Sequence, residues 1–371
     1  MTDRETLIQT FFNQRGTGKT TKKLYSLHIK NYEEFTEYDI VKLLNIAEKE
    51  ENDNIRWKNT DTRRFLLNYR EHLYSKHSVG TAKTYFSSIL TFYRHFEIEI
   101  PQLPYFSTKN TFHYQQISYD KLPDREVLQQ ALNIAPQKMK PVILFLSSSG
   151  VSRIDAYNIT IKDYLSATKE YHNSDDIYEA ISQMNNIDVI PTFFLTRQKT
   201  KQDYFTFCSH EAVKSINLYL LSREDKLTNE SKLFNISYRY IGKAFESINH
   251  KLNLGTVGAF NRIRAHMLRK YHASQLAEAG FSTEKINLLQ GRKLQGVAHE
   301  AYIRIKPHVL KEEYIAALPF LVIEEVNKFK TELEQTKEEL KQVKNENLEI
   351  KKNIRDETER IVNELLKEYL D

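Results

Sequence analysis

Side chains that can bind a phosphate group or move a proton recur in three segments of the sequence. In the first, an apolar stretch ends at Gly150, and Arg153 follows three residues later. In the second, His266 and Arg269 are three residues apart, so on a helix they share a face. A guanidinium group can donate two hydrogen bonds to phosphate oxygens, and an imidazole can act as a general acid or base.

The third segment adds a candidate nucleophile. Tyr302 lies ten residues after Arg292, which itself follows a glycine. A free phenol has a pKa of about 10, so Tyr302 needs a base or a strongly cationic site before it can attack. Tyr314 is the alternative nucleophile, but it lies in an amphipathic stretch, residues 311–318, where packing is the expected role. Arg292 can donate to a phosphate oxygen, yet as a permanent cation it cannot shuttle protons.

Helices are predicted around the first and second segments. Apolar periodicity predicts helices over residues 125–134 and 140–148. The polar residues 166–186 are expected to form a surface excursion. Helical patterns then resume at His210 and continue to the end of the chain. Because His266 and Arg269 lie in this helical part, their spacing places them together.

A β-hairpin is predicted between the first and second segments. Residues 193–197 and 203–207 are aromatic and β-prone, and a polar turn joins them. Lys199 and Lys201 both lie in that turn, two residues apart. The hairpin would therefore present one or both ammonium groups at its tip.

The first 100 residues are predicted to form short helices. The clearest pattern covers residues 81–96, where apolar side chains recur at spacings of three and four. Its opposite face carries Lys83, Thr84 and Arg94, which are side chains of the kinds that hold phosphates. A DNA contact and a solvated face are the two interpretations of this surface.

A glycine-rich run near the N-terminus, residues 16–21, resembles the end of a phosphate-binding loop. The full motif requires a glycine five residues before Gly18, and Asn13 stands there. Phe11-Phe12 is too short for the strand that should precede such a loop. We therefore expect no nucleotide cofactor, and we interpret the run as a flexible start to the first helix.

Residues 321–371 have heptad spacing and are predicted to form a coiled coil. Seam positions lie seven residues apart, beginning at Val326, and Asn347 is a candidate determinant of register or oligomeric state. A single solvated helix is the alternative. Residues 320–371 hold 10 basic and 14 acidic side chains, although the whole chain has a net charge of +5. A basic body with an acidic tail suits a nucleic-acid binder with a separate protein-interaction segment.

Composition excludes several classes of protein. Hydrophobic residues make up 40% and charged residues 28% of the 371, which excludes a wholly disordered chain. No apolar run is long enough to span a bilayer, and the N-terminus has no signal-peptide core. Cys208 is the only cysteine, so neither an intrachain disulfide nor a cysteine-based zinc site can form. We expect a cytoplasmic protein.

Taken in order, the candidate residues resemble the fingerprint of the tyrosine recombinase (phage integrase) family. That fingerprint is a Gly-x-x-Arg box, a hairpin lysine, His-x-x-Arg, a Gly-His/Trp box and a tyrosine. The matching residues here are Arg153, Lys199, His266, Arg269, Arg292 and Tyr302. The resemblance covers roughly residues 20–320, and runs such as Ser-Ser-Gly-Val-Ser-Arg are most similar to archaeal or viral members.

The resemblance implies a mainly α fold with a small β-hairpin (α+β). Residues 1–100 would form a helical core-binding domain that clamps DNA, and residues 101–119 a linker. Residues 120–320 would form the catalytic domain, followed by the coiled-coil tail of residues 321–371. The implied partners are double-stranded DNA and three further copies of the chain on paired DNA sites, with no membrane, so we expect the protein at the nucleoid.

The resemblance also assigns catalytic roles. Arg153 and Arg269 would clamp the scissile phosphate while Tyr302 attacks phosphorus and forms a 3′-phosphotyrosyl link. His266 would assist as the base. Lys199, or else Lys201 in the same turn, would protonate the departing 5′-oxygen. The implied reaction uses no metal and no nucleotide.

One position departs from the family pattern. Most members carry His or Trp where this sequence has Arg292, which would serve as a third phosphate ligand. His272 and His299 are expected to be structural.

The departure at Arg292 keeps a second interpretation open, a DNA-binding protein that has the fold and lacks catalysis. A coiled-coil structural protein is a third interpretation. The tail and the virus-like motifs favour an integrase of a mobile element, such as one that integrates a viral genome.

Overall fold

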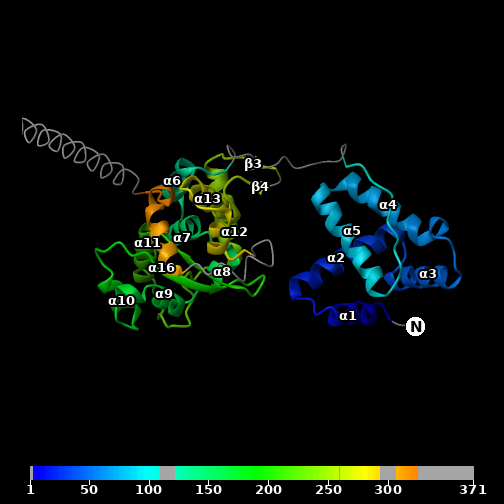
Figure 1. The fold of residues 1–371 in the computed structure, drawn as a ribbon, viewed down its shortest axis with the longest axis horizontal. Helices are drawn as coiled ribbons and strands as arrows, with labels where there is room; N and C mark the ends of the chain where they lie inside the picture. Colours follow the sequence, from blue (N-terminus) through cyan, green and yellow to red (C-terminus); the bar gives the residue numbers. More distant parts are fainter. Residues whose placement is uncertain (1–2, 109–121, 259, 293–305, 325–371) are drawn as a thin grey trace, which may run out of the picture. The chain divides into compact units, whose positions relative to one another are not determined.

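The computed structural model describes residues 3–108, 122–258, 260–292 and 306–324 (Figure 1). The chain forms two compact units, Met1–Gln116 and Ile117–Asp371. Both are mostly helical, and the described strands form two small antiparallel sheets. The predicted α+β class with a small hairpin is therefore confirmed. The predicted coiled coil lies almost wholly outside the described residues. Among those residues, no helix has the length and apolar character that a membrane span requires.

Helices with an aromatic core make up the described part of the first unit. Three of these helices follow a capping residue: Asp39, Thr60 and Ser78 each accept a hydrogen bond from a backbone N–H in the first turn of the helix they precede. The predicted helix over residues 81–96 is confirmed as α5, within two residues. The elements are α1 (Arg4–Gln14), α2 (Lys19–Thr36), α3 (Ile40–Asn52), the 3₁₀ helix η1 (Trp57–Asn59), α4 (Asp61–Lys76) and α5 (Val79–His95).

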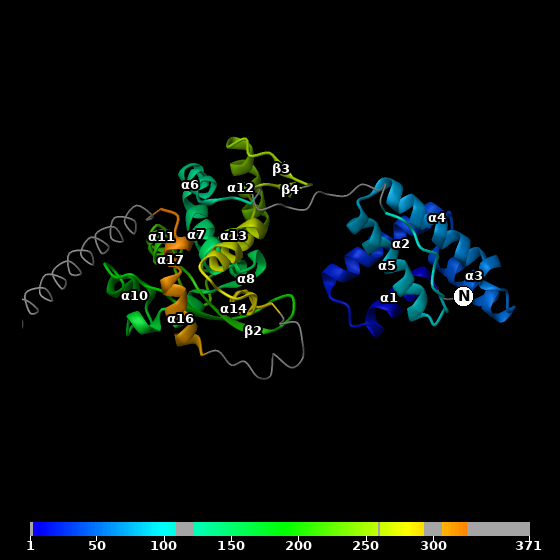
Figure 2. The same ribbon diagram turned by 45° about the horizontal axis from the view of Figure 1, so that its top comes forward.

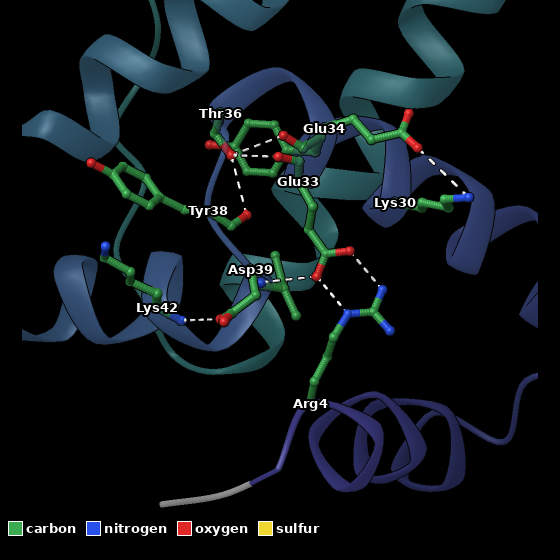
Figure 3. Close-up of polar contacts among 10 residues, drawn as sticks. Arg4, Lys30, Glu33, Glu34, Thr36, Tyr38, Asp39 and Lys42 are labelled. Atoms are coloured by element: carbon green, nitrogen blue, oxygen red, sulfur yellow. Dashed lines mark hydrogen bonds and ion pairs between the residues drawn. The ribbon is translucent and has the colours of Figure 1, made fainter.

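Helix α1 corrects the prediction that the first helix starts after the glycine-rich run. In the structure α1 ends before that run and α2 begins within it at Lys19, because Gly16 takes a positive φ of 57° between the two helices. Phe11 and Phe12 are buried on one side of α1. Figure 3 shows Arg4 of α1 paired with Glu33 of α2, whose carboxylate also accepts the Ile40 N–H at 2.9 Å. One glutamate thus joins three helices.

The second unit is built around α7, which is buried along its whole length. It packs against α11 on one side and α13 on another (Figure 2). The predicted helices over residues 125–134 and 140–148 are confirmed as α6 and α7. The helices are α6 (Arg125–Ile134), α7 (Lys140–Ser149), α8 (Arg153–Asn158), α9 (Ile161–Ala167), α10 (Ile177–Gln183), α11 (His210–Leu221), α12 (Tyr238–Lys251), α13 (Ala265–Glu278), α14 (Thr283–Leu289), α16 (Pro307–Ala316) and α17 (Leu318–Leu321), with 3₁₀ helices η3 (Gln137–Met139) and η4 (Lys169–Tyr171).

The predicted hairpin is confirmed within one residue. Strand β1 (Thr192–Thr196) pairs with β2 (Asp203–Phe207) in antiparallel register, with Thr196 opposite Asp203. Phe193 and Phe207 are buried, so these two aromatic side chains hold the hairpin to the core. Figure 2 shows α14 beside β2, and the two elements are in contact.

Two predictions about the second unit are wrong in part. Residues 166–186 are not merely a surface excursion, because they contain α10, whose Ile177, Ala180 and Ile181 are buried in the core. The helical pattern after residue 210 is interrupted by a second hairpin, β3 (Thr256–Val257) with β4 (Phe260–Asn261). Gly255 and Gly258 flank β3 with positive φ values of 67° and 63°, a conformation that glycine adopts readily.

Candidate active site

Arg269 on α13 connects the segments singled out by the sequence. Its side chain is buried, with only 4% of the residue exposed. Nη1 donates to the Gly150 carbonyl at 2.6 Å, and Nη2 donates to the Gln290 carbonyl at 2.5 Å. The first contact reaches the turn before Arg153, and the second reaches the residue before Gly291-Arg292. The His-x-x-Arg segment therefore holds the other two described segments together.

The end of α7 shows why a glycine precedes Arg153. Gly150 has a φ of 63°, and a Cβ placed there would lie 2.5 Å from Nδ1 of His272. No other residue fits this turn without moving the His272 ring. The next helix, α8, begins at Arg153 because the Ser152 hydroxyl accepts the Asp155 N–H at 3.3 Å. The sequence thus reverses the chain at Gly150 and starts a new helix with Arg153 in its first turn.

Arg153 lies against α12. Its guanidinium carbon is 3.9 Å from the centroid of the Tyr238 ring, which is a cation–π contact. A Cβ on Gly242 would come within 3.0 Å of an Arg153 Nη atom, so α12 leaves room for this side chain. Arg153 forms no ion pair with Asp155 in the described structure, because Asp155 is buried and accepts from the Ser152 hydroxyl and the Gln198 N–H instead.

The tip of the first hairpin is attached to this region at two points. Asp155 Oδ1 accepts the Gln198 N–H at 2.9 Å, and Arg197 Nη1 donates to the Gly291 carbonyl at 2.8 Å. Lys199 lies between these attachments and the strand β2, is exposed, and makes no hydrogen bond or ion pair with the described residues. Lys201 has a φ of 55° and donates to the Gln198 side chain at 3.3 Å. Lys199 therefore has the freer ammonium group of the two.

Positive charges crowd around Arg269. Burial, followed by the nearby charges of Arg292 and Arg197, lowers the pKa of Arg269 to about 10. The pKa of Arg292 is also lowered, by burial and by Arg197. These groups stay charged at neutral pH, since a guanidinium does not deprotonate there. Their mutual repulsion would be relieved by a bound anion, so the cluster has the electrostatics of a phosphate site.

His266 stands at the start of α13, one turn before Arg269. Desolvation lowers its pKa below the usual 6.5, and the charges of Arg264, Lys270, Arg269 and Arg292 lower it too. The imidazole is therefore neutral at pH 7 and can accept a proton. His266 is exposed as a residue, so a substrate can reach it.

The two tyrosines proposed as nucleophiles have different outcomes. Tyr302 lies outside the described residues, as does His299. Tyr314 is fully buried, and its hydroxyl donates to the Ser148 carbonyl at 2.7 Å. Burial raises the pKa of Tyr314 far above that of a free phenol. The packing role predicted for Tyr314 is confirmed.

His272 is also confirmed as a structural residue. It is completely buried one turn after Arg269, and Gln290 Nε2 donates to its Nδ1 at 3.1 Å. Burial, followed by the charges of Arg269 and Arg292, lowers the pKa of His272 to about 3. Its ring fills the space against Gly150 and stays neutral.

Sequence reasoning missed two residues of the cluster, Arg197 and Tyr204. Gly291 has a φ of 60°, and a Cβ there would lie 2.7 Å from the Tyr204 ring, so the glycine lets the chain cross that ring. Among the residues that the structure describes, the buried Tyr204 hydroxyl has no hydrogen-bond partner, and it lies beside the charges of Asp155, Arg269 and Arg197. The one sequence signal that could have indicated Arg197 was its place beside Lys199 and a threonine in the turn. Nothing in the sequence indicated Tyr204.

The predicted DNA-contact residues lie on the surface of α5. Lys83, Thr84 and Arg94 are exposed. The Thr84 hydroxyl donates to the Gly80 carbonyl of its own helix at 2.9 Å. Their contact with DNA stays a prediction. In the described ranges, no group of three His, Cys, Asp or Glu side chains is arranged to hold a metal ion.

Comparison with known proteins gives structural neighbours only. The sequence matches no family model and no curated protein. In fold, the chain is similar to the XerH site-specific recombinase bound to difH substrate, at 17% identity and a TM-score of 0.48, over 84% of this chain and 83% of that one. It is also similar to a lambda integrase tetramer bound to a Holliday junction, at 14% identity and a TM-score of 0.49, over 81% and 78%. The Tn1549 transposon integrase in complex with transposon right end DNA matches at 16% identity and a TM-score of 0.45, over 84% and 98%. At this level of similarity the function has to be argued from the side chains of the site.

Proposed function

We propose that the protein is a tyrosine-type site-specific DNA recombinase. The observation that carries this proposal is the pair of Arg269 and Arg292 next to a neutral, exposed His266. Such a cluster suits a phosphodiester whose negative charge grows in the transition state. Residues 120–320 would catalyse, and residues 1–100 would clamp double-stranded DNA.

The proposed reaction transfers a phosphodiester to a tyrosine. The Tyr302 oxygen forms a bond to phosphorus, and His266 accepts the phenolic proton. The bond from phosphorus to the 5′-oxygen breaks, and Lys199 gives that oxygen a proton. The product is a 3′-phosphotyrosyl link and a free 5′-hydroxyl. The link keeps the phosphodiester energy, so a new 5′-hydroxyl can reverse the step and rejoin the strand.

Arg269 can serve both the fold and the phosphate. A guanidinium has five N–H donors, and in the described structure two of them are used by the Gly150 and Gln290 carbonyls. The carbonyls fix the plane of the group, which prepares the remaining donors before substrate binds. Arg153 would complete the clamp by moving its guanidinium from the face of Tyr238 to the phosphate.

A covalent adduct tests the proposal. Nicked duplexes made from DNA flanking the gene would be incubated with wild type, Tyr302→Phe and Tyr314→Phe proteins and run on a denaturing gel. We expect a shifted band with wild type and with Tyr314→Phe, and none with Tyr302→Phe. Loss of the band only in Tyr314→Phe would contradict the nucleophile proposed here.

The presence of Arg292 supports one alternative, a DNA-binding protein of this fold without catalysis. A permanent cation at this position can bind phosphate and cannot move a proton. Tight binding to the same duplexes, with a steep dependence on salt and no covalent adduct, would favour this alternative.

We further propose that four copies assemble on paired DNA sites, as an integrase of a mobile element would require. The heptads of residues 321–371 would contribute to that assembly. Deleting residues 335–371 should weaken assembly more than binding to a single site. Sedimentation of the truncated protein with and without DNA measures both, and unchanged sedimentation would contradict the role of the tail.

A further inference from the structure

Arg197 makes more contacts than its place in an exposed turn requires. Its backbone N–H donates to the Gln202 carbonyl at 2.8 Å, and its own carbonyl accepts the Lys201 N–H at 2.8 Å. These two bonds close the turn, and any residue except proline could make them. Its side chain does something different, because Nη1 reaches the Gly291 carbonyl, 94 residues away in sequence, at 2.8 Å.

The turn that carries Lys199 is therefore held from two sides. On one side, Asp155 accepts the Gln198 N–H at 2.9 Å. On the other side, Arg197 binds the Gly291 carbonyl. The two attachments lie one and two residues before Lys199, whose own side chain is exposed and bonds to no described residue. The position of its ammonium group consequently depends on how these attachments hold the backbone.

A guanidinium at position 197 has an electrostatic cost. Its charge lowers the pKa of both Arg269 and Arg292, which means that it repels them. A neutral side chain would close the turn without this repulsion. The cost is compensated if the bond to Gly291 keeps the turn next to the Arg292 segment, where the phosphate is proposed to bind.

We propose that Arg197 is a positioning residue, which fixes the turn of Lys199 against the Gly291 carbonyl so that Lys199 can protonate the departing 5′-oxygen. The inference rests on the proposed function and deepens it. Arg197 acts through Lys199 and does not itself need to touch the substrate. Its loss should therefore slow one chemical event, leaving-group protonation, and spare DNA binding and attack on phosphorus.

The test compares two leaving groups in the full-length protein. One nicked duplex carries the normal 5′-oxygen at the scissile phosphate, and the other carries a bridging 5′-sulfur. A thiolate leaves without a proton, so the sulfur substrate bypasses the general acid. Single-turnover adduct formation would be measured for wild type, Arg197→Met, Arg197→Lys and Lys199→Met. Arg223→Met is the matched control, because Arg223 also donates to a backbone carbonyl, that of Lys232 at 2.7 Å, away from the cluster.

We expect Arg197→Met to cleave the oxygen substrate about 10²-fold more slowly than wild type, the loss that a misplacement of about 1 Å can cause. On the sulfur substrate it should approach the wild-type rate, as should Lys199→Met. Arg197→Lys, which keeps a donor and the charge, should recover part of the rate on oxygen. Arg223→Met should change the rate of adduct formation by the same factor on the oxygen and the sulfur substrate.

Three results would overturn the inference. An equal loss on both substrates would make Arg197 a phosphate ligand or a folding residue, and wild-type rates on both would leave it without a role. Failure of sulfur to rescue Lys199→Met would remove the acid that Arg197 is proposed to position. Absence of adduct from wild type on both substrates is a separate outcome, since it rejects the proposed function itself.

Discussion

The two units of the chain use their buried polar groups in different ways. In the first, Arg4 forms an ion pair with Glu33 at 2.6 Å, and the buried His28 hydrogen-bonds to Ser88 at 2.7 Å. In the second, Arg197 and Arg269 donate to backbone carbonyls and form no ion pair with a carboxylate in the described ranges. The second unit also pairs cations with carboxylates elsewhere, as Arg223 with Asp225 at 2.6 Å and Lys311 with Glu170. Around Arg269, in contrast, it gathers positive charge without such a pair among the described residues.

A cation that is paired with a carboxylate serves the fold. A cation without such a pair is available to a ligand. A partly buried charge without a counter-charge destabilises the protein, so its presence needs a reason beyond packing. Around Arg269 the missing negative charge would be supplied by a DNA phosphate. Four predictions, in order of decreasing effect, test whether the two units differ in this way.

Replacing Arg269 should have the largest effect. Arg269→Lys keeps the charge and cannot donate to two carbonyls and a phosphate in one plane. We expect adduct formation to slow by about 10²–10³-fold, the cost of removing a preorganised donor. Single-turnover kinetics on the nicked duplex would measure this, with Arg223→Lys as the control in the same unit. Similar rates for the two variants would show that the cluster has no special role.

Acid should destabilise the second unit through His272. The pKa of this residue is about 3 in the folded chain, against an ordinary 6.5, so between these pH values the unfolded chain binds a proton that the folded chain does not. Stability is complete above pH 6.5 and is lost as pH falls toward 3, by up to roughly 5 kcal/mol. His272→Asn should flatten this dependence in thermal melts followed by circular dichroism.

Two controls make the acid experiment specific. His308→Asn is the matched control, because His308 is an exposed histidine of the same unit. Trp57 is the only tryptophan and lies in the first unit, so its fluorescence reports that unit separately. If His272→Asn changed only the melt followed by Trp57 fluorescence, the pH dependence could not be assigned to His272 in the second unit.

The cations of α5 should affect affinity and not chemistry. Lys83→Ala and Arg94→Ala should each weaken DNA binding and lower the slope of log K against log salt by about 1, because each removes one phosphate contact. Fluorescence anisotropy at several salt concentrations measures the slope. Lys30→Ala is the matched control, since Lys30 lies 3.6 Å from Glu34 in its own helix. An unchanged slope would favour a merely solvated face for α5.

Removal of the Arg4 ion pair should have the smallest effect. Arg4→Met should lower the free energy of unfolding by about 1 kcal/mol, because the pair is partly exposed to solvent. Urea unfolding followed by Trp57 fluorescence would detect it, and adduct formation should stay at the wild-type rate. A loss of adduct comparable to that of Arg269→Lys would remove the distinction between the units.

Local patterns predicted much of the fold. The apolar spacing of residues 125–134 and the β-prone runs of the first hairpin appear in the structure almost at the predicted bounds. Helix α1 was missed because its buried residues, at positions 7, 8, 11 and 12, form a short stripe next to a glycine-rich run. The β3–β4 hairpin has strands of two residues, too short for an alternating pattern.

The site was predictable in its residue types and less so in its contacts. The order of Arg153, His266 and Arg269 could be seen in the sequence. The bond from Arg197 to Gly291 could not, because it joins residues 94 apart whose meeting depends on the whole unit. Likewise, Tyr204 enters the cluster only because Gly291 lets the chain cross its ring.

The most direct test of the account is to identify the amino acid that becomes linked to DNA. Wild-type protein would be trapped on the nicked duplex, digested with trypsin and nuclease, and the nucleotide-bearing peptide sequenced by mass spectrometry. The account predicts a phosphotyrosyl link at Tyr302 through a 3′-phosphate. A link at any other residue, or DNA bound tightly with no link at all, would contradict it.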